Sequence, residues 1–144
     1  MTAESEAANP RRPGRRRLVA LVDDDPSFLK ALARLLKVHG YAVEAFGTEQ
    51  EFLDSHARLA AHCLVLDVHM PNISGPELHD GLMASGVRIP AIFVTADPTP
   101  DVLARASRPG CYGVLLKPFV QEDLLRCLGT AMGDEEPSAR QTGA

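Results

Sequence analysis

The chain has 144 residues, of which 45% are hydrophobic, so it is long enough for one domain with a packed core. It holds no apolar run of membrane-spanning length and no signal peptide pattern, so neither a membrane-spanning nor a secreted protein is expected. The net charge of −4 is unevenly divided. Residues 1–17 hold five Arg against two Glu, and residues 18–132 hold nine Lys and Arg against fourteen Asp and Glu. An acidic domain does not by itself indicate nucleic-acid binding.

The two ends of the chain have no periodic apolar residues. Residues 1–17 are rich in arginine and are interrupted by proline and glycine, so we expect a disordered tail. Such an arm could contact phosphate or acidic lipid, but a solubilising tail without a partner is the favoured interpretation. Residues 133–144 are polar and predict a flexible C-terminal tail.

Cysteine and histidine usage indicates no metal site. The three cysteines are scattered without metal-type spacing, which favours free thiols in a reducing cytosol and a cytoplasmic protein. Two of them are predicted as small core residues. All the histidines but His69 are interpreted as ordinary surface residues: His39, His56, His62 and His79.

The first half of the domain alternates strand and helix. An apolar run over 18–22 predicts a buried strand that ends in the acidic residues 23–25. Helix-start residues follow at Pro26 and Ser27, and apolar residues at helical spacing continue to Gly40. A second strand is predicted over 41–46, then a helix that Thr48 caps, then a loose connection over 56–62.

The central stretch is a short apolar run over 63–66 that leads directly into Asp67 and is stopped by Pro71. An apolar run bounded by a turn signal is typical of a buried parallel strand. Asp67 would then lie at the carboxyl end of the strand, where open α/β sheets bind their ligands. A capping box of Ser74 and Glu77 predicts the start of the next helix.

Two more strand–helix units complete the pattern. A fourth strand over 91–94 ends in Thr95, and a proline-rich turn precedes a short helix. A fifth strand over 112–116 ends in Lys117, and an amphipathic helix runs to Met132. Five strand–helix units without a hairpin predict a doubly wound parallel sheet, five helices and right-handed crossovers.

The polar residues at the strand ends suggest one site. Asp23, Asp24 and Asp67 place carboxylates on adjacent strand ends, where they repel one another unless a cation binds. A small set of oxygen ligands with room for water suits Mg²⁺. Lys117 offers an ammonium and Thr95 a hydroxyl, so a carboxylate that accepts a phosphoryl group is a plausible chemistry.

These residues resemble the receiver domain of bacterial two-component response regulators over residues 18–132. The motifs occur in order and look most like the FixJ-type branch: VDDDP (22–26), LDVHMP (66–71), SG with EL (74–78), VTA (94–96) and LKPF (116–119). The resemblance implies a flavodoxin-like sheet of order 2-1-3-4-5. It also implies that the bond between Lys117 and Pro118 is cis.

The resemblance further implies a role for each site residue. Asp67 would be the phosphoacceptor, while Thr95 and Lys117 would contact the phosphoryl group. Asp24 would bind Mg²⁺ directly, Asp23 partly through water and His69 through its main-chain carbonyl. The residues that flank the path of attacking water would be His69 and Asp97, and a pair between them would lengthen the phosphoryl lifetime.

One position departs from the family pattern. Many receivers carry an aromatic residue three positions before the lysine, where this chain has Val114. Valine has no ring to turn inward and has restricted χ1 freedom. Tyr112 is two residues earlier, so strict alternation along the strand would place it on the same face as Val114. It is further from the site, so it is not expected to replace the ring. We therefore expect Thr95 to signal through the turn and short helix at 96–110.

The leading functional hypothesis is a stand-alone signalling module. It would take phosphate from a sensor histidine kinase or a phosphotransfer protein and then switch its contact with a downstream protein, with a weak homodimer as a further outcome. It would not be an enzyme acting on other substrates, and direct DNA binding and membrane contact are not expected. The alternatives are the receiver part of a longer transcription regulator or hybrid kinase, a Mg²⁺-dependent phosphatase or transferase, and an adaptor that works without phosphate.

Overall fold

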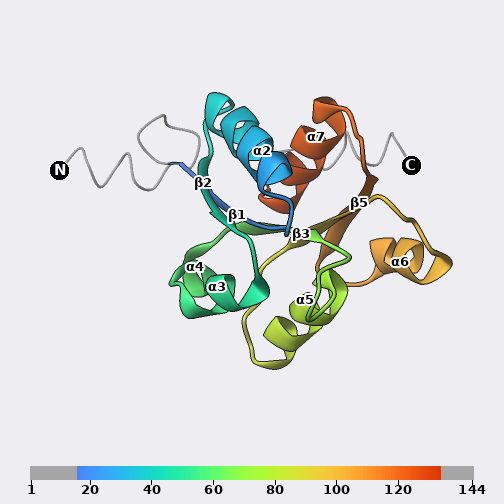
Figure 1. Ribbon diagram of the computed structural model, residues 1–144. Helices are drawn as coiled ribbons and strands as arrows, with labels where there is room; N and C mark the ends of the chain where they lie inside the picture. The colour runs from blue at the N-terminus through green and yellow to red at the C-terminus, as the bar shows by residue number, and fades with distance from the viewer. Residues whose placement is uncertain (1–15, 134–144) are drawn as a thin grey trace.

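The computed structural model describes residues 16–133, which form a parallel sheet of five strands covered by helices on both faces (Figure 1). The strand order is β2-β1-β3-β4-β5, which confirms the predicted order and the doubly wound topology. The predicted tails fall mostly outside the described residues. Arg17, placed in the N-terminal tail, instead donates from its guanidinium to the carbonyl of Met132. The strands are β1 (Leu18–Val22), β2 (Ala42–Phe46), β3 (Cys63–Asp67), β4 (Ala91–Thr95) and β5 (Cys111–Leu116).

The helices divide between the two faces of the sheet (Figure 1). One face is covered by α2 (Pro26–Val38) and α7 (Gln121–Ala131). The other is covered by α3 (Glu49–Asp54), α4 (Ala57–Ala60), α5 (Gly75–Ala84) and α6 (Pro100–Ala104), which continues as the 3₁₀ turn η1 (Arg105–Ser107). Within residues 16–133, no helix is both long and apolar enough to cross a membrane.

The described residues contain six α-helices and a 3₁₀ turn, whereas the sequence predicted five helices. The additional helix is α4, which lies in the stretch interpreted as a loose connection. Its first residue, Ala57, is fully buried against the core beside Phe52. The hydroxyl of Ser55 accepts a hydrogen bond from the amide of Ala57, which supports the start of this short helix.

The central strands have buried side chains on both faces. Every residue of β3 and β4 is buried, as expected for parallel strands that carry helices on both sides. Because side chains alternate along a strand, Ala20 and Val22 face the core under α3 and α5, and Val19 and Leu21 face the core under α2 and α7. Each fully buried leucine or valine contributes on the order of 1.5–3 kcal/mol, so these two cores hold the strand ends in place.

Short polar side chains start the helices directly after the strand ends. Asp25 accepts hydrogen bonds from the amides of Ser27 and Phe28, and Thr48 accepts one from Glu51. The capping box predicted at the start of α5 is also present. These caps satisfy amides that have no partner within the helix, and they set where each helix leaves the sheet.

The edge strand β5 is irregular. Ala91 pairs with Cys111 and Phe93 pairs with Val114, so one extra residue is inserted in β5. The period-two argument that placed Tyr112 and Val114 on one face therefore does not apply across this stretch. Tyr112 is 41% exposed, whereas Val114 packs against the core.

One histidine prediction is wrong. His79 is only 3% exposed, and its Nε2 lies 2.9 Å from the carbonyl oxygen of Ile89. Its ring packs edge-on against Phe93. The imidazole is tolerated in the core because a main-chain carbonyl satisfies it and an aromatic ring covers it.

Candidate functional site

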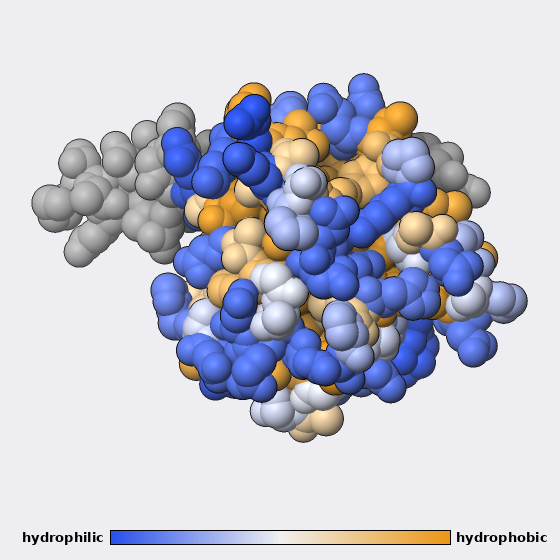
Figure 2. Space-filling model, viewed as in Figure 1, coloured by the Kyte–Doolittle hydropathy of each residue, from blue (hydrophilic) through white to orange (hydrophobic). Residues whose placement is uncertain are grey.

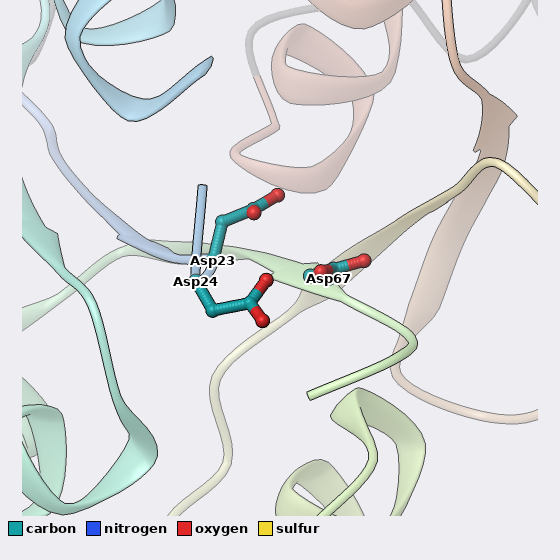
Figure 3. A group of neighbouring side chains, drawn as sticks. All are labelled: Asp23, Asp24 and Asp67. Carbon is teal, nitrogen blue, oxygen red and sulfur yellow. The ribbon is translucent and has the colours of Figure 1, made fainter. Parts of the chain in front are cut away.

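Three carboxylates gather at the carboxyl ends of β1 and β3 (Figure 3). Asp23 and Asp24 follow the last residue of β1, and Asp67 is the last residue of β3. Each offers an oxygen, and these oxygens all lie within 4.8 Å of one another. Asp23 and Asp67 are buried, at 2% and 6% exposed, while Asp24 is open to solvent. The sheet therefore brings together the residues that the sequence assigned to one site.

Lys117 supplies the cation among these acids. Its Nζ lies 2.8 Å from Oδ2 of Asp23 and 3.8 Å from Oδ1 of Asp67. The main-chain amide of Lys117 donates to the carbonyl of Thr95 at 2.7 Å, which ties the end of β5 to the end of β4. The bond between Lys117 and Pro118 is cis, as the resemblance implied.

Thr95 is fully buried at the end of β4, and its hydroxyl is engaged with the turn that follows. The oxygen accepts a hydrogen bond from the amide of Asp97 at 3.0 Å and donates to the carbonyl of Asp97 at 3.2 Å. The hydroxyl proton has one partner at a time. If it turned toward an anion beside Asp67, the carbonyl of Asp97 would lose its donor.

The electrostatics of the site favour a bound cation. Burial and the neighbouring Asp23 carboxylate raise the pKa of Asp67 to about 6, and Lys117 and the amide of His69 only partly oppose that rise. Three carboxylates face one ammonium, which leaves an excess of negative charge when all are ionised. Hard oxygen ligands with one open side fit the requirements of Mg²⁺, so these residues suit the metal.

His69 and Asp97 are both exposed, and they do not form an ion pair within 4 Å in this structure. The main-chain amide of His69 instead points back to Oδ1 of Asp67 at 3.4 Å. Their part in tuning the phosphoryl lifetime stays a prediction.

A family model for the response regulator receiver domain matches residues 19–128. The chain belongs to this family. Phosphorylated aspartate and Mg²⁺ are general features of receiver domains in two-component systems.

Individual relatives agree with this membership. The chain is 36% identical over 115 residues to the response regulator protein TmoT of Ectopseudomonas mendocina, covering 80% of this chain and 52% of TmoT. It is 32% identical over 126 residues to the transcriptional regulatory protein FixJ of Azorhizobium caulinodans, covering 88% of this chain and 60% of FixJ. The chain thus spans about half the length of the first curated relatives it matches.

Solved structures show the same fold. The response regulator StyR is 37% identical, with a TM-score of 0.74, over 89% of this chain and 66% of StyR. A CheY-like receiver domain protein from Methanospirillum hungatei JF-1 is 22% identical, with a TM-score of 0.72, over 83% of this chain and 95% of its own. At that identity the second likeness supports the fold alone.

Two residues that the sequence did not assign to the site lie against it. The ring of Phe28, in the first turns of α2, is contacted by Nζ of Lys117. Gly75, the first residue of α5, passes so close to the main chain of Asp67 that a Cβ there would overlap the carbonyl oxygen of Asp67. Gly75 belongs to a motif that carried the resemblance, but its contact with the main chain of Asp67 is visible only in the fold. No sequence signal assigned Phe28 to the site.

Proposed function

We propose that this chain is a receiver that accepts a phosphoryl group on Asp67 from a phosphohistidine and then alters its protein contacts. A carboxylate oxygen of Asp67 attacks phosphorus, the bond from phosphorus to the donor nitrogen breaks, and the donor keeps that electron pair. The observation that carries the proposal is the gathering of Asp23, Asp24, Asp67 and Lys117 at one sheet edge in a member of this family.

Each neighbour of Asp67 has a part in this chemistry. Lys117 holds negative charge on a phosphoryl oxygen, since its ammonium already lies within 4 Å of Asp67. Thr95 donates its hydroxyl to another oxygen. Asp23, Asp24, Asp67 and the carbonyl of His69 would hold Mg²⁺, which supplies charge neutralisation when bound.

Incubation with acetyl phosphate and Mg²⁺ tests the proposal. Intact-mass measurement should show the gain of one phosphoryl group, lost on treatment with base and absent when a chelator removes Mg²⁺. A protein that stays unmodified under conditions that label another receiver would refute the proposal. Turnover of a separate substrate with Mg²⁺ would favour a phosphatase or transferase instead.

Asp24→Ala should weaken Mg²⁺ binding at least tenfold, because it removes a carboxylate from a site with few protein ligands. Phosphorylation at limiting Mg²⁺ should slow accordingly. Calorimetric titration with Mg²⁺ measures the first effect, and Asp25→Ala is the matched control, because Asp25 caps α2 instead. An unchanged Mg²⁺ affinity in Asp24→Ala would mean that the metal binds elsewhere.

The surface beside Lys117 supports a helical phosphodonor, such as the bundle of a sensor kinase or a phosphotransfer protein. An apolar groove runs between α2 and residues 117–119, which lead into α7, and apolar surface is visible between these two helices in Figure 2. Helix α2 carries no acidic residue and three basic ones, so an acidic partner face would complement it. The groove is lined by Phe28, Ala31, Leu32, Leu35, Lys117, Pro118 and Phe119.

The relatives favour the alternative of a receiver within a longer regulator, because the chain spans about half of their length. The Thauera aromatica relative is named transcriptional regulatory protein TdiR. Residues 18–132 would form the receiver in either case, with DNA contact left to other parts of such a regulator.

Chemical crosslinking with and without acetyl phosphate tests for the weak homodimer.

Phosphorylation should change amide hydrogen exchange mainly in residues 96–110. Thr95 would release the carbonyl of Asp97 to reach the phosphoryl group, and α6 has only one buried residue, Val102. The far end of the segment is held by Arg105, which donates two hydrogen bonds to Asp80 of α5. Exchange by mass spectrometry should show little change at 112–116. A main change around Tyr112 and Val114 would contradict this route.

His69→Ala should shorten the lifetime of the phosphoryl group by a few-fold. In the phosphorylated protein, the His69 side chain would pair with Asp97 and screen the path of water, although the two do not pair in this structure. Dephosphorylation after removal of acetyl phosphate is the measurement, and His56→Ala is the control. An equal or slower rate in His69→Ala would count against the pair.

A further inference from the structure

Within the described part of the chain, three side chains lie against the ammonium of Lys117, and one of them carries no charge. Its ammonium lies against Asp23 and Asp67 on one side, and 4.2 Å from the centre of the Phe28 ring on the other. An ammonium at this distance is attracted to the electron-rich face of the ring. Only 21% of the Lys117 side chain is exposed, so water screens the contact incompletely.

The Phe28 ring is fixed by its own packing. It meets Phe119 edge-to-face, with ring centres 6.1 Å apart and planes at 86°. Phe119 follows the cis Lys117–Pro118 bond, so the segment that carries Lys117 also supports the ring. The fully or nearly buried residues of α2 are Leu29, Leu32 and Leu36. Phe28 is only partly buried and packs against the margin of this core, where its ring also meets Lys117.

The ring matters because the Asp23 carboxylate has two possible partners, Lys117 and a bound cation. Asp23 holds Lys117 in this structure, yet it also belongs to the carboxylate group that suits Mg²⁺. A cation bound there competes with Lys117 for Asp23. The aromatic face cannot serve as a hard oxygen ligand, so it stays available to the ammonium whatever Asp23 contacts.

We propose that Phe28 is a positioning residue for Lys117: its ring holds the ammonium beside Asp67 in the orientation that meets the incoming phosphoryl group. The inference rests on the proposed function, because phosphoryl transfer is the reaction that Lys117 assists. Phe28 itself touches no reacting atom. Without the ring, Lys117 samples more conformations and fewer of them face the phosphoryl group.

A spectroscopic measurement tests the contact without any activity. The chain has three lysines, Lys30, Lys37 and Lys117, so lysine labelled with ¹³C at Cε gives three methylene signals. The Lys117 signal, assigned by its loss in Lys117→Arg, should be shifted upfield by the ring current. The shift should persist in Phe28→Tyr and disappear in Phe28→Leu, with and without Mg²⁺. A Lys117 signal at the ordinary position in the unaltered protein would overturn the inference.

Kinetics test the consequence. Phe28→Leu should slow phosphorylation by acetyl phosphate about two- to thirtyfold, the range expected from loss of one cation–π contact. Phe28→Tyr should restore the rate to within about twofold, because it keeps the ring face. The matched control is Phe46→Leu, which makes the same change in another edge-to-face pair, that of Phe46 and Phe52. It should leave the rate unchanged.

The outcomes separate the two proposals. Normal phosphorylation of Phe28→Leu, or failure of Phe28→Tyr to restore the rate, would overturn the positioning role while Asp67 remained the acceptor. If the unaltered protein is not phosphorylated, the proposed function fails, and the Lys117 signal still decides whether the ring holds the ammonium.

Discussion

Asp67→Asn should abolish phosphorylation by acetyl phosphate and Mg²⁺. Asparagine keeps the shape of the side chain but replaces a carboxylate oxygen, the nucleophile, with an amide that does not accept a phosphoryl group at neutral pH. Intact-mass spectrometry measures the loss. Asp123→Asn, which removes a carboxylate exposed on α7, is the matched control and should be phosphorylated normally. Full phosphorylation of Asp67→Asn would place the acceptor elsewhere.

The same variant should be more stable than the unaltered protein, so unfolding cannot explain its inactivity. The pKa of Asp67 is raised to about 6 by burial and by Asp23, so ionising this acid costs the folded state free energy. The cost is absent below the unfolded pKa near 4, grows as the pH rises and is complete above about 6. At pH 8 without Mg²⁺, Asp67→Asn should gain on the order of 1–3 kcal/mol of unfolding free energy.

Denaturant unfolding of Asp67→Asn and of the unaltered protein at pH 4 and pH 8 checks the direction of this stability change. The gain should shrink to well below its value at pH 8, because at pH 4 Asp67 is protonated in the folded state and about half protonated in the unfolded state. Adding Mg²⁺ at pH 8 should also reduce the difference, because the metal stabilises the three-carboxylate form. A gain that is equal at both pH values would show that ionisation of Asp67 is not its source.

Gly75→Ala should disrupt the site from the start of α5. A Cβ at this position would overlap the main-chain carbonyl oxygen of Asp67 and crowd Leu66. The amide of Gly75 also donates to the carbonyl of Val68, so the turn cannot simply swing away. Relief requires movement of the main chain that carries Asp67, at a cost of about 1–3 kcal/mol. Mg²⁺ affinity should fall as well, because the carboxylates lose their spacing.

Gly81→Ala is the matched control within the same helix. A Cβ at Gly81 would meet no atom within 4 Å beyond its own turn of the helix, and alanine favours helix over glycine by about 0.5–1 kcal/mol. Gly81→Ala should therefore stabilise the protein and leave Mg²⁺ binding unchanged. Denaturant unfolding and calorimetry on both variants give the comparison. Equal effects of the two substitutions would show that the close approach to Asp67 does not matter.

The sequence predicted the strands and the polar residues at their ends because each of these signals is local, whereas the order of the sheet came from the family resemblance. An apolar run that ends in Asp67 or Thr95 marks both a buried strand and its polar end. Parallel strands place their carboxyl ends on one edge, so residues far apart in the chain could be assigned to one site. The caps at Thr48 and Ser74 were predicted for the same reason, since a cap acts within three residues.

Contacts between helices and strands could not be predicted from such local signals. The burial of His79 depends on a carbonyl from Ile89 and a ring from β4, and polarity alone suggested the surface. The extra residue in β5 is defined only by its pairing with β4. Helix α4 forms because tertiary packing buries Ala57, which overrides a weak local signal.

The sequence by itself determined which residues gather at the sheet edge, because strand ends and their polar residues are encoded in adjacent positions. Only the tertiary structure decided how these residues are held. The ring of Phe28 reaches Lys117, 89 positions along the chain, because the start of α2 packs beside residues 117–119, which follow β5. The close approach of Gly75 to Asp67 depends on how α5 leaves β3. Such contacts follow from packing in three dimensions, which no spacing in the sequence specifies.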